Sequence, residues 1–187
     1  RALLLLNDEP GTSARAYLRR SANAGATNLV VIVSRSLLSA SVSTDNHGTK
    51  LLGPSRYDLS VAENGLLGLR ERNALALLGS YDGRLAVWSY TGDALVGADG
   101  LKAAVSYTES HARPKDDSAL PDLVLRSSTT TFRLSYPIRR GREGDVIARI
   151  NWSVENANSE ALGLRLHEDK VRPLRVGITW SGIDDWS

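Results

Sequence analysis

Four stretches near the end of the chain alternate between apolar and polar residues, and this alternation restricts the possible folds more than any other feature. The stretches are Thr129–Tyr136, Val146–Val154, Leu162–Leu166 and Leu174–Trp180. Neighbouring side chains on a strand point to opposite faces, so a two-residue period predicts an antiparallel sheet with one face in a core and one in water. The residues expected to share that core are Phe132, Leu134, Ile150, Trp152, Val176, Ile178 and Trp180.

Earlier segments predict further strands. The β-branched run Asn28–Val33 predicts a strand buried on both faces, and Tyr57–Val61 predicts another. Ala74–Leu78 and Leu85–Tyr90 flank a turn that contains Asp82-Gly83, which predicts a hairpin. The segment before Ala74 is rich in leucine but interrupted by glycine, so we expect a loop or short helix there.

The N-terminal region predicts a short helix over Ser13–Ala22. Thr12 or Ser13 is a suitable N-cap, and Ala14, Tyr17 and Leu18 fall near one face of such a helix. Its opposite face would carry Arg15, Arg19 and Arg20.

These segments together predict an all-β fold, an antiparallel β-sandwich of jelly-roll type with about eight to ten strands and one or two short helices. A length of 187 residues is ordinary for one such domain. We expect a basic N-terminal arm with a short helix over residues 1–27 and the sandwich domain over residues 28–187.

Composition removes several classes of function. The chain has no cysteine, which excludes disulfides, thiolate catalysis and cysteine-ligated metals. No apolar run approaches the roughly 18 to 20 residues of a membrane-spanning helix, so no membrane partner is expected. The chain begins at Arg1 and contains no methionine, which indicates a processed or trimmed chain and leaves the compartment open.

Catalytic motifs are missing as well. His47, His111 and His167 lie in separate loop-like segments without a spacing that suits a metal. There is no G-x-S-x-G elbow, P-loop or G-x-G-x-x-G, so we expect no catalytic residue, no metal and no cofactor, nucleotides included. One carboxylate, Glu155, follows the predicted strand of Trp152 and is a candidate for a sugar-binding or hydrolytic site.

Arginine carries most of the positive charge, because only four of the 23 basic residues are lysine. Guanidinium groups bind phosphates and carboxylates in a bidentate manner. Beside Arg15, Arg19 and Arg20, a second cluster falls on the predicted hairpin loop Pro137–Asp145 and consists of Arg139, Arg140 and Arg142. We expect the two clusters to bind an acidic partner, RNA above all, although a solvated surface would show the same pattern.

In architecture, a basic N-terminal part followed by a cysteine-free sandwich is similar to the single jelly-roll coat proteins of small RNA viruses. This similarity implies a non-enzymatic coat subunit that associates with copies of itself, contacts RNA and resides in the virion. A carbohydrate- or protein-binding sandwich is the alternative, and a hydrolase on the same fold is the third possibility. A large assembly in solution would favour the first.

Overall fold

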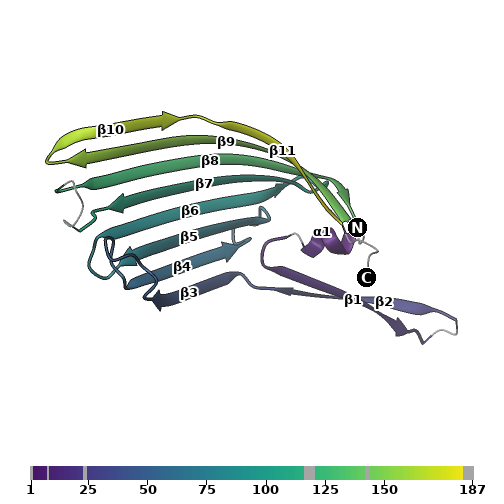
Figure 1. Cartoon of the computed structure of the whole chain (residues 1–187). Coiled ribbons are helices and arrows are strands. Elements are labelled where there is room, and N and C mark those ends of the chain that lie inside the picture. Colours follow the sequence, from purple (N-terminus) through teal and green to yellow (C-terminus); the bar gives the residue numbers. More distant parts are fainter. Residues whose placement is uncertain (1, 8, 23–24, 116–120, 142–143, 183–187) are drawn as a thin grey trace.

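The computed structural model describes residues 2–7, 9–22, 25–115, 121–141 and 144–182, and shows one short helix and two antiparallel sheets (Figure 1). The helix is α1 (Ala2–Asn7), and the small sheet pairs β1 (Thr12–Arg20) with β2 (Thr27–Arg35). The large sheet has nine strands. They are β3 (Leu38–Asp45), β4 (Arg56–Asn64), β5 (Glu71–Ser80), β6 (Leu85–Val96), β7 (Leu101–Ala112), β8 (Val124–Arg140), β9 (Gly144–Ala161), β10 (Leu164–Val171) and β11 (Leu174–Gly182).

The predicted fold class, all-β and antiparallel with little helix, is confirmed. From β3 to β9, every strand of the large sheet pairs with the strand that follows it in the sequence. The described strands therefore form an up-and-down meander, without the crossing connections of a jelly roll. They number eleven, slightly more than expected from the sequence.

The last two strands behave as one long strand with a break. Val171 lies opposite Glu155, and Leu174 lies opposite Trp152, so β10 and β11 meet β9 in the same register. Pro173, between them, has no N–H to donate, but its carbonyl accepts a hydrogen bond from the Ser153 N–H at 3.0 Å. The sheet thus ends, beside β9, in an edge nearly as long as β9 itself.

The helix predicted over Ser13–Ala22 is wrong, because this segment contains strand β1. Its sequence also alternates, with Ala14, Ala16 and Leu18 on one face of the strand. Pairing with β2, whose β-branched residues favour a strand, supplies the backbone hydrogen bonds and overrides the local helix preference. The pairing also spans the predicted boundary between residues 27 and 28.

The hairpin β1–β2 is attached to one end of the large sheet. Asn7 of α1 bonds both to the Ala14 carbonyl, at 3.1 Å, and to the Ala14 N–H, at 2.6 Å. Glu9 then forms an ion pair with Arg70 at 2.8 Å, in the β4–β5 connection. The hairpin therefore contacts a rim of the large sheet and leaves the broad faces of that sheet uncovered (Figure 1).

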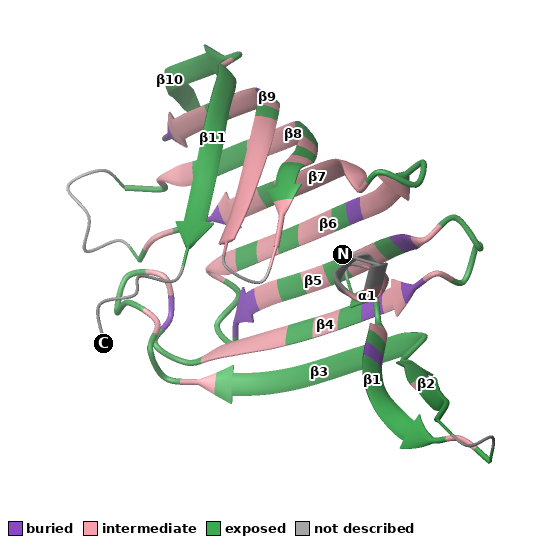
Figure 2. Cartoon of the chain, turned by 90° about the vertical axis from the view of Figure 1, so that its right-hand side faces the viewer, coloured by how far each residue is buried: buried purple, intermediate pink, exposed green. Residues whose placement is uncertain are grey.

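The shared core predicted for Phe132, Trp152 and their neighbours is wrong. Each of the seven residues is exposed, and the buried apolar residues of the described chain are four alanines. Figure 2 shows that buried positions are few and scattered over the strands. The chain exposes 12992 Å², whereas a compact protein of this mass would expose about 8,800 Å². The strand Asn28–Val33, expected to be buried on both faces, is likewise mostly exposed. Among the described residues, neither α1 nor the two-stranded sheet β1–β2 buries these side chains.

Candidate functional site

The strand register collects the large apolar side chains on one face of the large sheet. Phe132 lies opposite Trp152, which lies opposite Leu174, and the next row joins Leu134 to Ile150. Directly opposed residues share a face, so these rows lie on the same side. We call this side the apolar face. Its exposed large residues include Val42, Leu59, Val61, Leu75, Leu77, Trp88, Phe132, Leu134, Ile150, Trp152, Leu174, Val176, Ile178 and Trp180.

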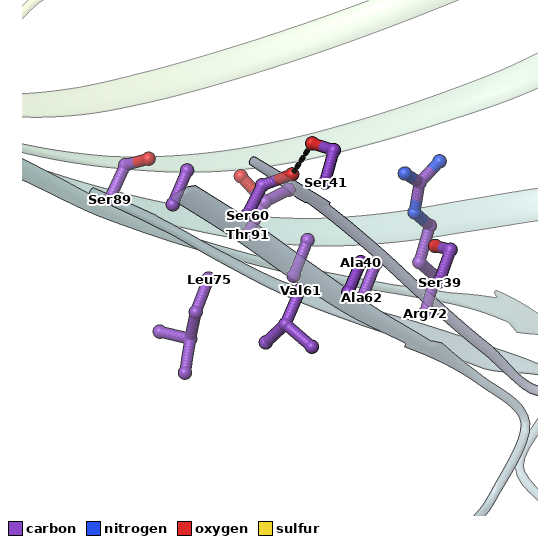
Figure 3. A pocket seen from close by; sticks show the side chains of 12 residues that line it. Ser39, Ala40, Ser41, Ser60, Val61, Ala62, Arg72, Leu75, Ser89 and Thr91 are labelled. Carbon is purple, nitrogen blue, oxygen red and sulfur yellow. Dashed lines mark hydrogen bonds between the residues drawn. The ribbon is translucent and has the colours of Figure 1, made fainter. Parts of the chain in front are cut away.

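The other side, which we call the polar face, carries hydroxyl, amide and charged groups. Several of them bond across neighbouring strands. The pairs are Ser41 with Ser60 at 2.7 Å, Ser110 with Ser127 at 2.7 Å, Thr131 with Ser153 at 3.0 Å, and Arg133 with Asn151 at 2.8 Å. Figure 3 shows the division directly, because the polar side chains there point up from the sheet while Val61 and Leu75 point down.

The polar face is the more shielded of the two. Most buried side chains of the large sheet belong to it, namely Ala62, Asn64, Ser80, Ala112, Ser153 and Ala161. A curved sheet crowds the side chains on its concave side and separates those on its convex side. The polar face is therefore the concave side of the sheet, and the apolar face is the convex side.

A shallow hollow of about 240 Å³ lies over β3–β6 on this sheet (Figure 3). Its lining includes small side chains such as Ser41 and Ser60, the apolar residues Val61 and Leu75, and Arg72 as the charged member. The lining contains no histidine, carboxylate or other general base. The hollow can hold water or a small solute, but it offers no group for acid–base catalysis.

Polar groups mark two limits of the apolar face. On one side Glu109 accepts hydrogen bonds from the Trp88 indole N–H at 3.2 Å and the Tyr107 hydroxyl at 3.0 Å. The hydrogen bond to Glu109, aided by burial and by the charge of Glu109, raises the pKa of Tyr107. On the other, Tyr90 donates to Asn73 at 2.7 Å, and Asn73 donates to Glu63. Aromatic rings with a polar tip thus separate the apolar surface from its charged margins.

On β6 the apolar-face positions from Ala86 to Val96 carry no charged or amide side chain. Their partners on β5 and β7 include Glu71 opposite Ala94, Asn73 opposite Gly92 and Glu109 opposite Trp88. The uncharged surface is therefore shorter on the neighbouring strands than on β6.

The six arginines selected from the sequence do not form one site. Arg15 and Arg19 share a face of β1, whereas Arg20 falls on its other face. Arg139 and Arg140 belong to strand β8 and not to a loop, and Arg142 lies outside the described residues. Arg140 also forms an ion pair with Asp145 at 2.9 Å. The structure therefore brings no more than pairs of these guanidinium groups to a common surface.

The other candidate groups are also separated. Trp152 and Glu155 project from opposite faces of β9, so they cannot form the sugar-binding pair considered from the sequence. In the parts of the chain that the structure describes, no three His, Asp or Glu residues are grouped in a way that could hold a metal ion. Among these same residues, no helix is long and apolar enough to cross a membrane.

Comparison with known proteins gives one informative result. No protein-family model matches the chain, and no curated protein sequence matches it. Among solved structures, the fold is similar to that of CdiB from Escherichia coli, with a TM-score of 0.73 and 14% sequence identity. The similarity covers 98% of this chain and 35% of CdiB, so the chain spans about a third of the length of that protein. At this level of identity, the similarity concerns the fold.

Proposed function

We propose that the chain forms part of the wall of a membrane-embedded closed sheet, with its apolar face against lipid and its polar face lining a water-filled passage. The observation that carries this proposal is the division of the sheet into an exposed apolar convex face and a polar concave face. Lipid is the partner whose chemistry matches a continuous apolar surface bounded by aromatic rings with polar tips.

The magnitudes favour lipid over water on the apolar face. Val176 is 73% exposed and Trp180 is 72% exposed, on the outermost strand of the sheet. Exposed apolar patches on proteins that function in water rarely exceed a few hundred Å². The apolar face carries more than a dozen exposed large side chains across β3–β11. Its exposed apolar area is therefore well above a few hundred Å².

The proposal has a consequence for the two edges. In lipid, every backbone N–H and C=O needs a hydrogen-bond partner, so a sheet within a bilayer must close on itself. The free sides of β3 and of the β10–β11 edge therefore pair with further strands, from additional polypeptide or from another molecule. Self-association, which the sequence analysis also predicts, would supply partners for the two edges. Contact with RNA as a coat subunit stays a separate prediction.

The test uses the tryptophans, since Trp88, Trp152 and Trp180 all lie on the apolar face. The chain is folded into vesicles of phosphatidylcholine with or without bromine atoms on the acyl chains. We expect brominated chains to quench most of the tryptophan emission, and aqueous acrylamide to quench it weakly. Emission that responds to acrylamide and ignores the brominated lipid would contradict the proposal.

A cysteine scan supplies a second readout, because the natural chain has no cysteine. Single cysteines at positions 174 to 179 of β11 receive a fluorescent label in turn. Labels at 174, 176 and 178 should be quenched by lipid-borne nitroxides, and labels at 175, 177 and 179 by aqueous iodide. A scan without this two-residue alternation would place both faces in the same medium.

A further inference from the structure

Three arginines from different strands come together on the polar face, and the sequence analysis assigned none of them. Arg133 of β8 and Arg175 of β11 both lie opposite Asn151 of β9, in one row across the sheet. Arg149 lies on the same face of β9, two residues from Asn151. With strands about 4.8 Å apart and a rise of about 3.4 Å per residue, the three backbone positions are about 8–10 Å from one another.

Other charged groups of the polar face include two close ion pairs. Arg56 forms a close ion pair with Asp45 at 2.9 Å, and Lys102 with Asp93 at 2.7 Å. Such pairs largely cancel their own fields.

Arg133 and Arg149 bond to neutral groups. The Arg133 Nε donates to the Asn151 amide oxygen at 2.8 Å, and an Arg149 terminal nitrogen donates to the Thr179 hydroxyl at 2.8 Å. Arg175 approaches a carboxylate, Glu155, at a long 3.8 Å. Among the described residues, the cluster therefore keeps a net positive charge. The charges of Arg56 and Lys102, in contrast, are neutralised by their carboxylate partners.

The surface beside the cluster is open. Gly177 lies directly opposite Arg149, and a Cβ placed on this glycine would meet no atom within 4 Å. Ser135, on the other side of Arg149, is also small. A hydrated anion can therefore approach the guanidinium groups from the concave side without displacing a large side chain.

We propose that Arg133, Arg149 and Arg175 form an anion-attracting patch that makes the passage favour small inorganic anions over cations. The proposal rests on the proposed function, in which the polar face lines a passage. The backbone positions of the three arginines are spaced by about one Debye length, so their fields overlap at physiological salt. Guanidinium is more weakly hydrated than an ammonium group, which favours direct contact with an anion.

The test measures anion concentration at the patch without requiring a conducting passage. A fluorescent label is attached to the variant Gly177→Cys, and its quenching by iodide is divided by its quenching by neutral acrylamide. A local potential of about one kT would raise the iodide ratio about threefold over that of a label on Ser41→Cys, distant on the same face. Adding R133S, R149S and R175S should remove this enhancement.

Two controls separate the patch from general effects. The variant R15S/R19S/R20S removes the same charge from the hairpin β1–β2 and should leave the ratio at position 177 unchanged. Raising the ionic strength to about 1 M should abolish the enhancement by screening. Equal ratios at positions 41 and 177, or a ratio at 177 that survives loss of the three patch arginines, would overturn the proposal.

The result is independent of lipid insertion, because the same ratios can be measured in detergent micelles. If brominated lipids fail to quench the tryptophans while the iodide enhancement persists, the membrane proposal fails and the anion patch remains. If the tryptophans are quenched and iodide shows no preference, the passage lacks the proposed selectivity.

Discussion

Phe132 and Trp152 stack on adjacent strands with ring centroids 5.5 Å apart, yet they are 47% and 45% exposed. An aromatic pair of this kind contributes about 0.5–1.5 kcal/mol beyond its buried area. In a core, these rings would be covered on all sides. Here they cover each other and present their remaining surface to the environment of the apolar face.

Because Trp152 is exposed, its substitution should lower the free energy of unfolding less than substitution of a buried aromatic residue would. Emptying a buried aromatic site costs about 3–5 kcal/mol. We expect Trp152→Leu to cost less than about 1.5 kcal/mol, because a leucine side chain keeps the face apolar and leaves no cavity. The free energy of unfolding, from urea titration of the chain in lipid vesicles, measures the difference.

The adjacent residue gives the matched comparison. Ser153 is 4% exposed on the polar face and hydrogen bonds to Thr131 at 3.0 Å. Ser153→Leu should cost more than Trp152→Leu, since it crowds the concave side and leaves the Thr131 hydroxyl without its partner. A larger loss from Trp152→Leu would indicate that Trp152 is packed in a core.

A second prediction introduces charge on each face of β5. Leu75→Arg places a guanidinium on the apolar face and should destabilise the sheet in vesicles by about 2–4 kcal/mol. Ala76→Arg places the same group on the polar face, beside the hollow that Ala76 helps to line, and should have a small effect. Equal losses for the two variants, measured by the same urea titration, would argue against lipid contact.

Three of the four alternating stretches lie within strands, whereas Leu162–Leu166 begins in the turn before β10, with Leu162 at a positive φ of 53°. Thr129–Tyr136 lies within β8, Val146–Val154 within β9, and Leu174–Trp180 within β11. The pattern also assigned Phe132 and Trp152 correctly to a common face. Alternation determines which residues share a face, but it does not say whether protein, lipid or water covers that face.

Mean hydropathy could not show whether protein, lipid or water covers this face. A hydropathy window of about 20 residues detects membrane-spanning helices and not strands. In a strand such as β6, the apolar positions are separated by polar ones such as Ser89 and Asp93, so the mean hydropathy stays low. A usable signal was the number of alternating segments, since the part of the chain that the structure describes holds no further apolar layer that could cover them all.

The arginine patch could not be predicted for a different reason. Arg133, Arg149 and Arg175 are far apart in the sequence, and the register of three strands brings them together. The clusters that sequence proximity suggested, such as Arg19 with Arg20, fall on opposite faces of a strand. On a sheet, charges that act together are separated by whole hairpins and not by one or two residues.

A third prediction concerns the contact between Tyr57 and Gly79, which lie opposite each other on β4 and β5. A Cβ at Gly79 would collide with the Tyr57 ring, which covers this glycine. Gly79→Ala should therefore displace the ring and cost about 1–3 kcal/mol. In the background of Tyr57→Ala, the same substitution should cost much less, and a double-mutant cycle of unfolding free energies measures this coupling.

The last prediction is a pH dependence that originates in Glu71. This side chain is 4% exposed, and its carboxylate accepts hydrogen bonds from the Leu67 and Leu69 N–H groups, each at 2.7 Å. Burial acts to raise the pKa of Glu71, but the backbone donors, aided by the charge of Arg35, outweigh it and hold the pKa below the ordinary value of 4.5. Because the pKa is lower in the folded chain, Glu71 stabilises the fold above about pH 4.5, and this contribution is lost as the pH falls through the folded-state pKa.

Glu71→Gln keeps the shape but cannot ionise, so the difference in unfolding free energy between the natural chain and this variant should be constant near neutral pH and shrink below pH 4.5. A difference that stays constant down to pH 3, or grows on acidification, would show that the charged carboxylate does not hold the loop between β4 and β5.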